Sequence, residues 1–193
     1  MTANLILASS SPFRKELLNR LNVAFECHSP EVDESLLSEE SADSYVRRLA
    51  VAKAQKLAMD FPGAIIIGSD QCAVLGDEIL GKPGNHLKAL EQLKKAQGKT
   101  VVFHTGLCVL QPSSSFQQVD NILFRVNFRN LSDRQLEHYL RTEEPYQCAG
   151  SFKSEGYGVA LFSKMTGDDP TALIGLPLIR LTHMLEQAGI SVV

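Results

Sequence analysis

The segment from Leu5 to Lys15 constrains the fold more than any other, because a short apolar run passes directly into small hydroxyl residues and then into a helix start. Ser11 is a natural N-cap, and Pro12 suits the first helical position. A strand that leads into a helix N-terminus turns N–H groups and hydroxyls toward one point, where a phosphate can bind. The alternative is an ordinary strand, turn and capped helix without a ligand.

The residues that follow this turn favour a nucleotide over a bare phosphate. Arg14 and Lys15 add positive charge beside it. Phe13 places a flat apolar ring there, which a phosphate does not need but a nucleobase would use. The other interpretation of Phe13 is a hydrophobic contact at the helix start.

Length and composition indicate one globular domain over residues 1–193, with 44% hydrophobic residues. The formal net charge of −3 gives no general attraction for nucleic acid, so a small anion fits better than a polymer. The four cysteines show no CxxC or zinc-type spacing, and no apolar run is long enough to span a membrane. We therefore expect reduced thiols, a cytoplasmic location and no membrane partner.

Hydrophobic periodicity predicts strands that alternate with helices, some of the strands being joined by hairpins. This order is typical of an α/β fold with a mixed twisted sheet and helices on both faces. The expected strands are 5–8, 64–68, 71–75, 78–80, 100–110, 119–128 and 156–162, the expected helices are 12–21, 41–61, 85–96, 132–140 and 173–188 with a break near Pro177, and the expected polar loops are 27–38 and 111–118.

Asp70 follows the apolar run Ile65–Ile67 and the small residues Gly68 and Ser69. Ligand sites of α/β proteins lie at the carboxyl ends of such strands. A carboxylate there can bind a divalent metal or take a proton from water, whereas a structural aspartate would more often cap a helix or close a turn. Because the next residues look extended, we favour the functional interpretation.

Three further charged residues are candidates for the same site. Lys53 lies on the apolar face of the helix predicted over 41–61, so it either snorkels to solvent or meets an anion. Lys82, in the constrained loop Gly81–Gly84, can hold an ammonium at the mouth of a pocket, although surface turns often contain such residues. Glu34 is an acid on an irregular segment and would by itself be a solvated loop charge.

Several common site motifs are absent from the sequence. It contains no Walker A sequence, HExxH or GxGxxG, which excludes the usual P-loop, zincin and Rossmann explanations. GxSxG is also missing, which argues against a hydrolase built on a serine nucleophile.

Four motifs together resemble the Maf family of nucleotide pyrophosphatases, over nearly the whole chain. They are Leu7–Arg14 (LASSSPFR), Gly68–Asp70 (GSD), Gly81–Pro83 (GKP) and Gly175–Leu178 (GLPL). The resemblance implies an inosine-triphosphatase-like α/β fold. It also implies hydrolysis of a nucleoside triphosphate to the monophosphate and pyrophosphate, with a divalent metal cation, Mg²⁺ or Mn²⁺.

The resemblance also implies roles for individual residues. Asp70 takes the position of the proton acceptor, with Glu34 as its partner for metal or water. The phosphate-contacting positions fall on Ser9, Ser11, Arg14, Lys53 and Lys82. A triphosphate with about four negative charges requires a metal and several cations, so the charge pattern agrees with these roles.

Three positions resemble the subgroup that hydrolyses 7-methyl-GTP more than the subgroup acting on dTTP and UTP, namely Phe13, Gln71 and Glu155. Methylation at N7 makes guanine cationic, which an aromatic face attracts. The carboxylate of Glu155 can accept hydrogen bonds from guanine N1–H and the exocyclic amine. The alternative for Glu155 is a solvated loop acid.

Two other functions stay open at this point. One is a pyrophosphatase for another canonical or noncanonical nucleotide. The other is a nucleotide-binding regulator of cell division, which the family's association with septum inhibition suggests. We also expect a homodimer, which is frequent among small α/β enzymes of this type.

Overall fold

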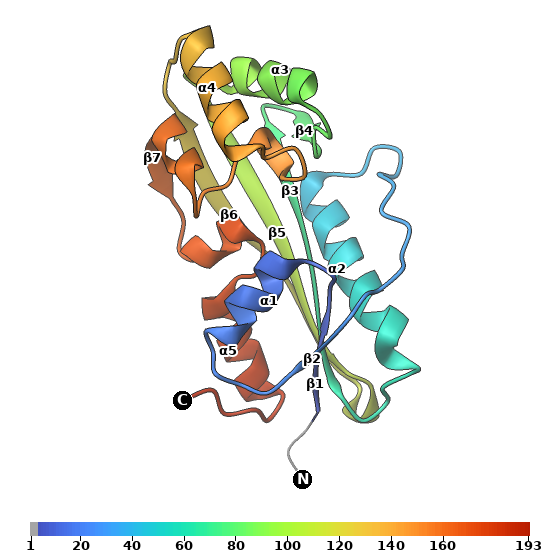
Figure 1. The fold of residues 1–193 in the computed structure, drawn as a ribbon. Coiled ribbons are helices and arrows are strands. Elements are labelled where there is room, and N and C mark those ends of the chain that lie inside the picture. The colour runs from blue at the N-terminus through green and yellow to red at the C-terminus, as the bar shows by residue number, and fades with distance from the viewer. Residues whose placement is uncertain (1–3) are drawn as a thin grey trace. The chain divides into compact units, whose positions relative to one another are not determined.

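The computed structural model describes residues 4–193 (Figure 1). Its helices are α1 (Pro12–Asn19), α2 (Ala42–Ala58), α3 (His86–Ala96), α4 (Asp133–Glu143) and α5 (Leu178–Gln187). Its strands are β1 (Leu5–Ala8), β2 (Glu26–His28), β3 (Ile65–Leu75), β4 (Glu78–Leu80), β5 (Thr100–Gln111), β6 (Phe116–Phe128) and β7 (Phe162–Thr166). Short 3₁₀ turns are η1 (Pro112–Ser114), η2 (Ala149–Ser151), η3 (Tyr157–Leu161) and η4 (Pro170–Ile174).

The strands form a mixed sheet, as the sequence predicts. Their order is β2-β1-β3-β5-β6-β7, with β4 paired to β3. β1 is parallel to both β2 and β3, whereas the β3–β4 and β6–β7 pairs are antiparallel. Parallel pairs require crossover connections, which α1 and α2 supply, and the antiparallel pair β3–β4 needs only the turn at Gly76 and Asp77.

The described chain divides into two compact units. Unit 1 comprises residues 4–71, 105–122 and 169–193, and unit 2 comprises residues 72–104 and 123–168. Because β3, β5 and β6 each contribute residues to both units, neither unit is one continuous stretch of sequence. The single domain that we predict over 1–193 stays a prediction.

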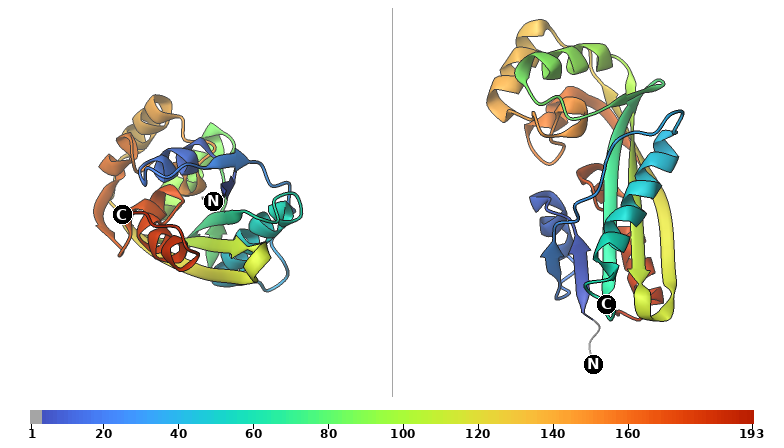
Figure 2. Two further views of the ribbon diagram at one scale, coloured as in Figure 1. Left: turned by 90° about the horizontal axis from the view of Figure 1, so that it is seen from below. Right: turned by 90° about the vertical axis from the view of Figure 1, so that its right-hand side faces the viewer.

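The core of unit 1 follows from the alternation of side chains along β1. Leu5 and Leu7 pack in one apolar cluster with leucines of α1 and α5, and Ile6 and Ala8 pack in another with α2. Figures 1 and 2 show α1 and α5 on one side of these strands and α2 on the other. Each leucine or isoleucine buried in this way contributes about 1.5–3 kcal/mol. Unit 1 therefore has helices on both faces of its sheet.

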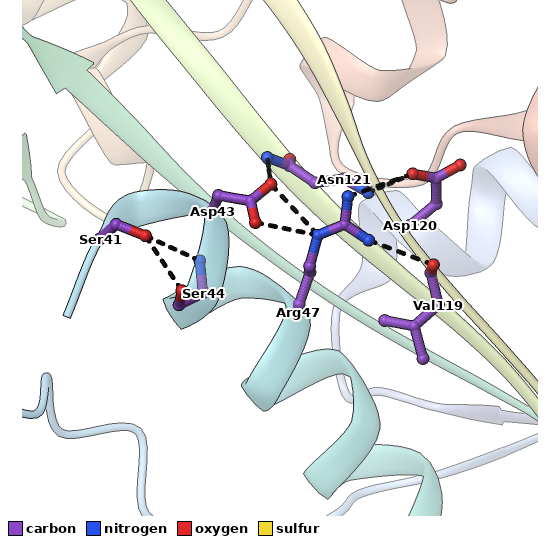
Figure 3. A network of polar contacts seen from close by, with 7 residues as sticks. All are labelled: Ser41, Asp43, Ser44, Arg47, Val119, Asp120 and Asn121. Carbon is purple, nitrogen blue, oxygen red and sulfur yellow. Dashed lines mark hydrogen bonds and ion pairs between the residues drawn. The ribbon is translucent and has the colours of Figure 1, made fainter.

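A polar network fixes the beginning of α2 to β6 (Figure 3). Arg47 Nε donates to Asp43, and its terminal nitrogens reach the carbonyl of Val119 and the carboxylate of Asp120 at 3.2 and 3.4 Å. Ser41 caps the helix by accepting from Ser44 N at 3.2 Å. These contacts fix the helix that carries Lys53.

Unit 2 is built on aromatic packing. Phe103, Phe128, Phe152 and Phe162 meet edge to face, with ring centroids 4.7–5.7 Å apart. α3 and α4 lie side by side (Figure 1). α4 begins with a capping box in which Ser132 and Gln135 satisfy each other's backbone N–H groups.

Three of the sequence-based boundaries are wrong in an informative way. Residues 64–68 and 71–75 are not two strands, because β3 continues through the buried residues Gly68, Ser69 and Asp70. The start of the predicted loop 27–38 belongs to β2, which needs β1 as a partner to form. The predicted hairpin loop 111–118 is shorter, since β5 runs to Gln111 and β6 begins at Phe116.

The strand predicted over 156–162 is also wrong, because residues 157–161 form η3 and β7 begins only at Phe162. The apolar side chains of Tyr157 and Val159 in this segment are exposed. Gly158 is buried so closely against the carbonyl of Lys153 that no side chain would fit. The helix predicted over 173–188 begins only at Leu178, because residues 170–174 form η4 and Pro177 is the N-cap of α5. The remaining predicted helices and strands are confirmed within about three residues at their ends.

Cys27, Cys108 and Cys148 form no disulfide within the described residues. No helix in residues 4–193 is both long and apolar enough to cross a membrane.

Candidate active site

A lysine flanked by two carboxylates forms the centre of the candidate site in unit 1. Lys53 Nζ lies 2.6 Å from Asp70 Oδ1 and 2.6 Å from Glu34 Oε1. Lys53 and Asp70 are only 6% and 7% exposed, whereas the side chain of Glu34 is 52% exposed. Lys53 therefore pairs with two carboxylates of the protein instead of snorkelling to solvent, and its contact with a phosphate stays a prediction.

Gly68 allows this contact. A Cβ at Gly68 would lie 2.1 Å from the carbonyl oxygen of Ala50 on α2, so only glycine lets the helix lie this close to β3. Gly106 on β5 has the same relation to the carbonyl oxygen of Val46. The glycine in the Gly-Ser-Asp motif therefore holds the helix of Lys53 against the strand of Asp70.

The loop that carries Glu34 is attached to the same helix. Tyr45 Oη donates to the carbonyl of Glu34 at 3.0 Å, and Arg48 donates to the carbonyl of Ser35 at 3.0 Å. Arg48 also pairs with Glu40 at 2.6 and 2.7 Å, and this contact lowers the pKa of the Glu40 carboxyl. α2 thus positions an acid that local sequence would leave in solvent.

The turn between β1 and α1 has the predicted capped geometry. Ser11 is the N-cap, and its hydroxyl accepts from Arg14 N at 3.4 Å. The buried hydroxyl of Ser9 accepts from Ser11 N at 3.1 Å and from Arg14 Nη1 at 3.5 Å. These contacts use two of the N–H groups that we expected for phosphate, and they leave the Ser9 hydroxyl hydrogen as a donor.

Arg14 is the second fixed cation of the site. Its Nε donates to the carbonyl of Gly175 at 2.8 Å. Burial lowers the pKa of the Arg14 guanidinium, and the charges of Asp70 and Glu34 oppose that change. A guanidinium stays protonated at any physiological pH, so Arg14 and Lys53 give this site two positive charges against two carboxylates. Phe13 is half-buried beside Arg14 on α1.

Gln71 is held by backbone carbonyls. Its Nε2 donates to the carbonyls of Ala172 and Leu173 at 2.7 and 3.1 Å and to Thr105 Oγ1 at 3.1 Å. Three acceptors fix the orientation of this amide. Its oxygen is therefore the atom that Gln71 can offer to a ligand.

Sequence reasoning missed Ser69 as a site residue. Its buried hydroxyl lies 2.9 Å from the carbonyl of Gly106 and 3.0 Å from that of Gly175. Its place in the Gly-Ser-Asp motif, between a glycine and the candidate base, was the available signal.

Lys82 and Glu155 belong to unit 2, where both are exposed on irregular segments. Burial raises the pKa of Cys148; Lys153 and Lys82 lower it, and Glu155 and Glu143 raise it. Unit 2 thus brings Lys82 and Glu155 near one thiol. Their roles toward a nucleotide stay predictions.

The carboxylate pair in unit 1 fits a divalent cation of the Mg²⁺ type. Such a cation is usually held by one or two carboxylates together with water and substrate phosphates. Asp70 and Glu34 supply two carboxylates that already meet at one ammonium. Within residues 4–193 there is no cluster of three or more His, Cys, Asp or Glu side chains of the kind that holds a metal without substrate.

The site thus joins a mixed α/β sheet to a buried ammonium, an arginine and two carboxylates. The family model for Maf-like proteins matches residues 4–188, and the chain belongs to that family.

The relatives agree with that assignment over nearly the whole chain. A protein of Nitrosococcus oceani named 7-methyl-GTP pyrophosphatase is 53% identical over 96% of this chain and 93% of its own length. One of Methylobacillus flagellatus with the same name is 53% identical over 98% of each chain. The Ham1 protein structure of Staphylococcus aureus is 13% identical, with a TM-score of 0.53 over 96% of this chain and 99% of that one. This likeness confirms the expected inosine-triphosphatase-like fold.

Proposed function

We propose that this protein is a nucleoside triphosphate pyrophosphatase that hydrolyses 7-methyl-GTP to 7-methyl-GMP and pyrophosphate, and so removes a modified nucleotide from the pool. The observation that carries the proposal is the buried contact of Lys53 with Asp70 and Glu34, next to Arg14 and Ser9. The names of the relatives at 53% identity support the substrate.

Asp70 is the base of the proposed reaction. Its carboxylate, held by Lys53, orients a water and takes its proton, while the water oxygen attacks the α-phosphorus in line. The bond from the α-phosphorus to the bridging oxygen breaks, and its electron pair leaves with pyrophosphate. Arg14, Lys53, Lys82 and the Ser9 and Ser11 hydroxyls stabilise the charge that develops on this leaving group.

Asp70 and Glu34 are the residues that would hold the divalent cation, Mg²⁺ or Mn²⁺. When bound, the cation supplies positive charge that neutralises the phosphate oxygens. Lys53 keeps the two carboxylates together until a substrate arrives.

Base selection falls to Phe13, Gln71 and Glu155. The ring of Phe13 attracts the cationic 7-methylguanine, and the fixed Gln71 oxygen accepts from a donor on the base. Glu155 accepts from N1–H and the exocyclic amine, and pyrimidines offer no equivalent edge with two donors.

We also propose a cytoplasmic enzyme that works as a homodimer without a nucleic-acid partner. The dispersed spacing of the four cysteines in the sequence supports the location, and the net charge of −3 supports the preference for a small substrate. Light scattering after size exclusion measures the oligomeric state, and the mass of a monomer would contradict the dimer.

The decisive experiment is a turnover panel of 7-methyl-GTP, GTP, ITP, dTTP and UTP, with Mg²⁺ or Mn²⁺, in which released pyrophosphate is measured. We expect kcat/KM to be highest for 7-methyl-GTP and turnover to stop when EDTA removes the metal. Higher kcat/KM for dTTP or UTP would contradict the specificity. Tight nucleotide binding without metal-dependent pyrophosphate release would contradict the enzyme.

A further inference from the structure

The carbonyl of Gly175 is the point at which the C-terminal segment contacts the candidate site. It accepts from Arg14 Nε at 2.8 Å, and the Ser69 hydroxyl lies 3.0 Å away. Gly175 has φ +119°, a conformation that side-chain-bearing residues rarely adopt, so the direction of this carbonyl depends on the turn in which it lies. The residues that hold this turn in place therefore also determine the orientation of the Arg14 side chain.

A buried carboxylate holds both ends of the turn. Asp169 is 3% exposed, and its Oδ1 accepts from Thr171 N at 3.0 Å and from Thr171 Oγ1 at 2.6 Å. Its Oδ2 accepts from Ile179 N at 2.8 Å, in the first turn of α5. Thr171 Oγ1 accepts in turn from Leu178 N at 2.8 Å.

These contacts replace a missing helix cap. The N-cap residue of α5 is Pro177, whose side chain cannot accept a hydrogen bond from the first-turn N–H groups. Asp169 and Thr171 satisfy two of those groups from outside the helix, and the positive end of α5 stabilises the buried charge of Asp169. Across residues 4–193, the only ion pairs of Asp residues involve positions 43, 70, 120 and 133, so Asp169 is held by neutral donors and a helix end.

We infer that Asp169, through Thr171 and the Gly175 carbonyl, is a positioning residue that sets the orientation of the Arg14 guanidinium toward the phosphate chain. An arginine recognises phosphate through a planar fork, so its orientation decides how many N–H groups face the ligand. The Gly175 carbonyl holds Nε and the Ser9 hydroxyl accepts from Nη1 at 3.5 Å, which leaves the other terminal N–H groups to the phosphates. This inference rests on the proposed function, in which Arg14 binds phosphate.

The first test compares Asp169→Asn with Asp168→Asn, a change at the exposed neighbouring residue. The asparagine amide cannot accept from both Ile179 N and Thr171, so the turn loosens. We expect KM for 7-methyl-GTP and the Kd for inorganic pyrophosphate each to rise about tenfold, and kcat to fall as well, because Arg14 binds the phosphate chain and also stabilises the charge that develops on the leaving group. Asp168→Asn should match the parent.

A second pair covers the case in which Asp169→Asn does not fold. Thr171→Val removes the bridging hydroxyl and should raise KM and the pyrophosphate Kd, whereas Thr171→Ser keeps the hydroxyl and should restore both. A purely structural role would lower kcat per total protein in Thr171→Val and leave KM unchanged, and that result would overturn the inference. Measurements on the unmodified protein distinguish failure of the proposed function from failure of the positioning role. If the unmodified protein neither binds pyrophosphate nor hydrolyses nucleotide, the proposed function is wrong, whatever the variants show.

Discussion

In unit 1 Lys53 and Asp70 are buried and paired with each other, whereas Lys82 and Glu155 of unit 2 are exposed on irregular segments. Lys53 is held by two carboxylates, and Arg14 by a carbonyl and a hydroxyl. The Glu155 carboxylate accepts from the hydroxyl of its neighbour Ser154 at 3.2 Å.

This difference separates two tasks. Stabilising charge on a phosphate chain requires donors that do not reorganise during the reaction, and burial with fixed partners provides this. The exposed carboxylate of Glu155 is free to exchange water for a base. We therefore expect changes at Asp70 and Lys53 to affect turnover of every nucleotide, and changes at Glu155 to affect the choice among nucleotides.

The largest effect is expected for Asp70→Asn, which removes the proposed base. We expect kcat with 7-methyl-GTP to fall by a factor of about 10² to 10⁴, because an amide cannot take the proton from water. Asp60→Asn, at an exposed position after α2, is the matched control. A folded Asp70→Asn protein that binds nucleotide and keeps full turnover would rule out the mechanism.

Lys53→Met tests whether the buried ammonium serves every substrate. The change leaves Asp70 and Glu34 without their shared cation, so the free energy of unfolding should fall by about 3 kcal/mol. We expect kcat/KM to fall about a hundredfold for 7-methyl-GTP and GTP alike. Lys56→Met, on the exposed face of α2, should leave both quantities nearly unchanged. Unequal losses of kcat/KM for the two nucleotides would show that Lys53 also takes part in choosing the nucleotide, which would contradict this expectation.

Glu155→Gln tests the opposite side of the comparison. The amide lacks the negative charge that favours the cationic 7-methylguanine, so the ratio of kcat/KM for 7-methyl-GTP over GTP should fall about tenfold. Glu91→Gln, an exposed change on α3, provides the control. An unchanged ratio across the nucleotide panel would remove Glu155 from base selection.

The smallest effect concerns Cys108, in the core of unit 1 beside α2. Burial raises the pKa of its thiol from 9.0 to about 12, so the folded protein keeps a proton that the unfolded chain loses. Stability is therefore complete below pH 9 and is lost as the pH rises toward 12. Between pH 8.5 and 10, urea unfolding should show a loss of about 1 kcal/mol from this group. Cys108→Val should flatten that slope, and an equally steep slope in the variant would contradict the assignment.

Local patterns in the sequence were enough for most of the helices and for the turn at Ser11, because caps and periodicity are properties of neighbouring residues. The buried face of α2 also pointed to Lys53. The strand predicted over 156–162 is wrong because residues 157–161 form the 3₁₀ turn η3, in which Tyr157 and Val159 are exposed. The continuation of β3 through Asp70 was missed, because Gly68 and Ser69 resemble a turn until α2 packs against them.

The sequence by itself determined the family motifs, the chemical types of the candidate site residues and the separation of the lysine at position 53 from the solvent-facing charges. Only the tertiary structure decided that Glu34 shares the ammonium of Lys53 and that Asp169 caps a helix nine residues after it. It also decided that the Gly175 carbonyl holds Arg14. The physical reason is that capping and periodicity act within one turn of chain, whereas burial of a charge depends on which distant groups the fold brings within hydrogen-bond distance.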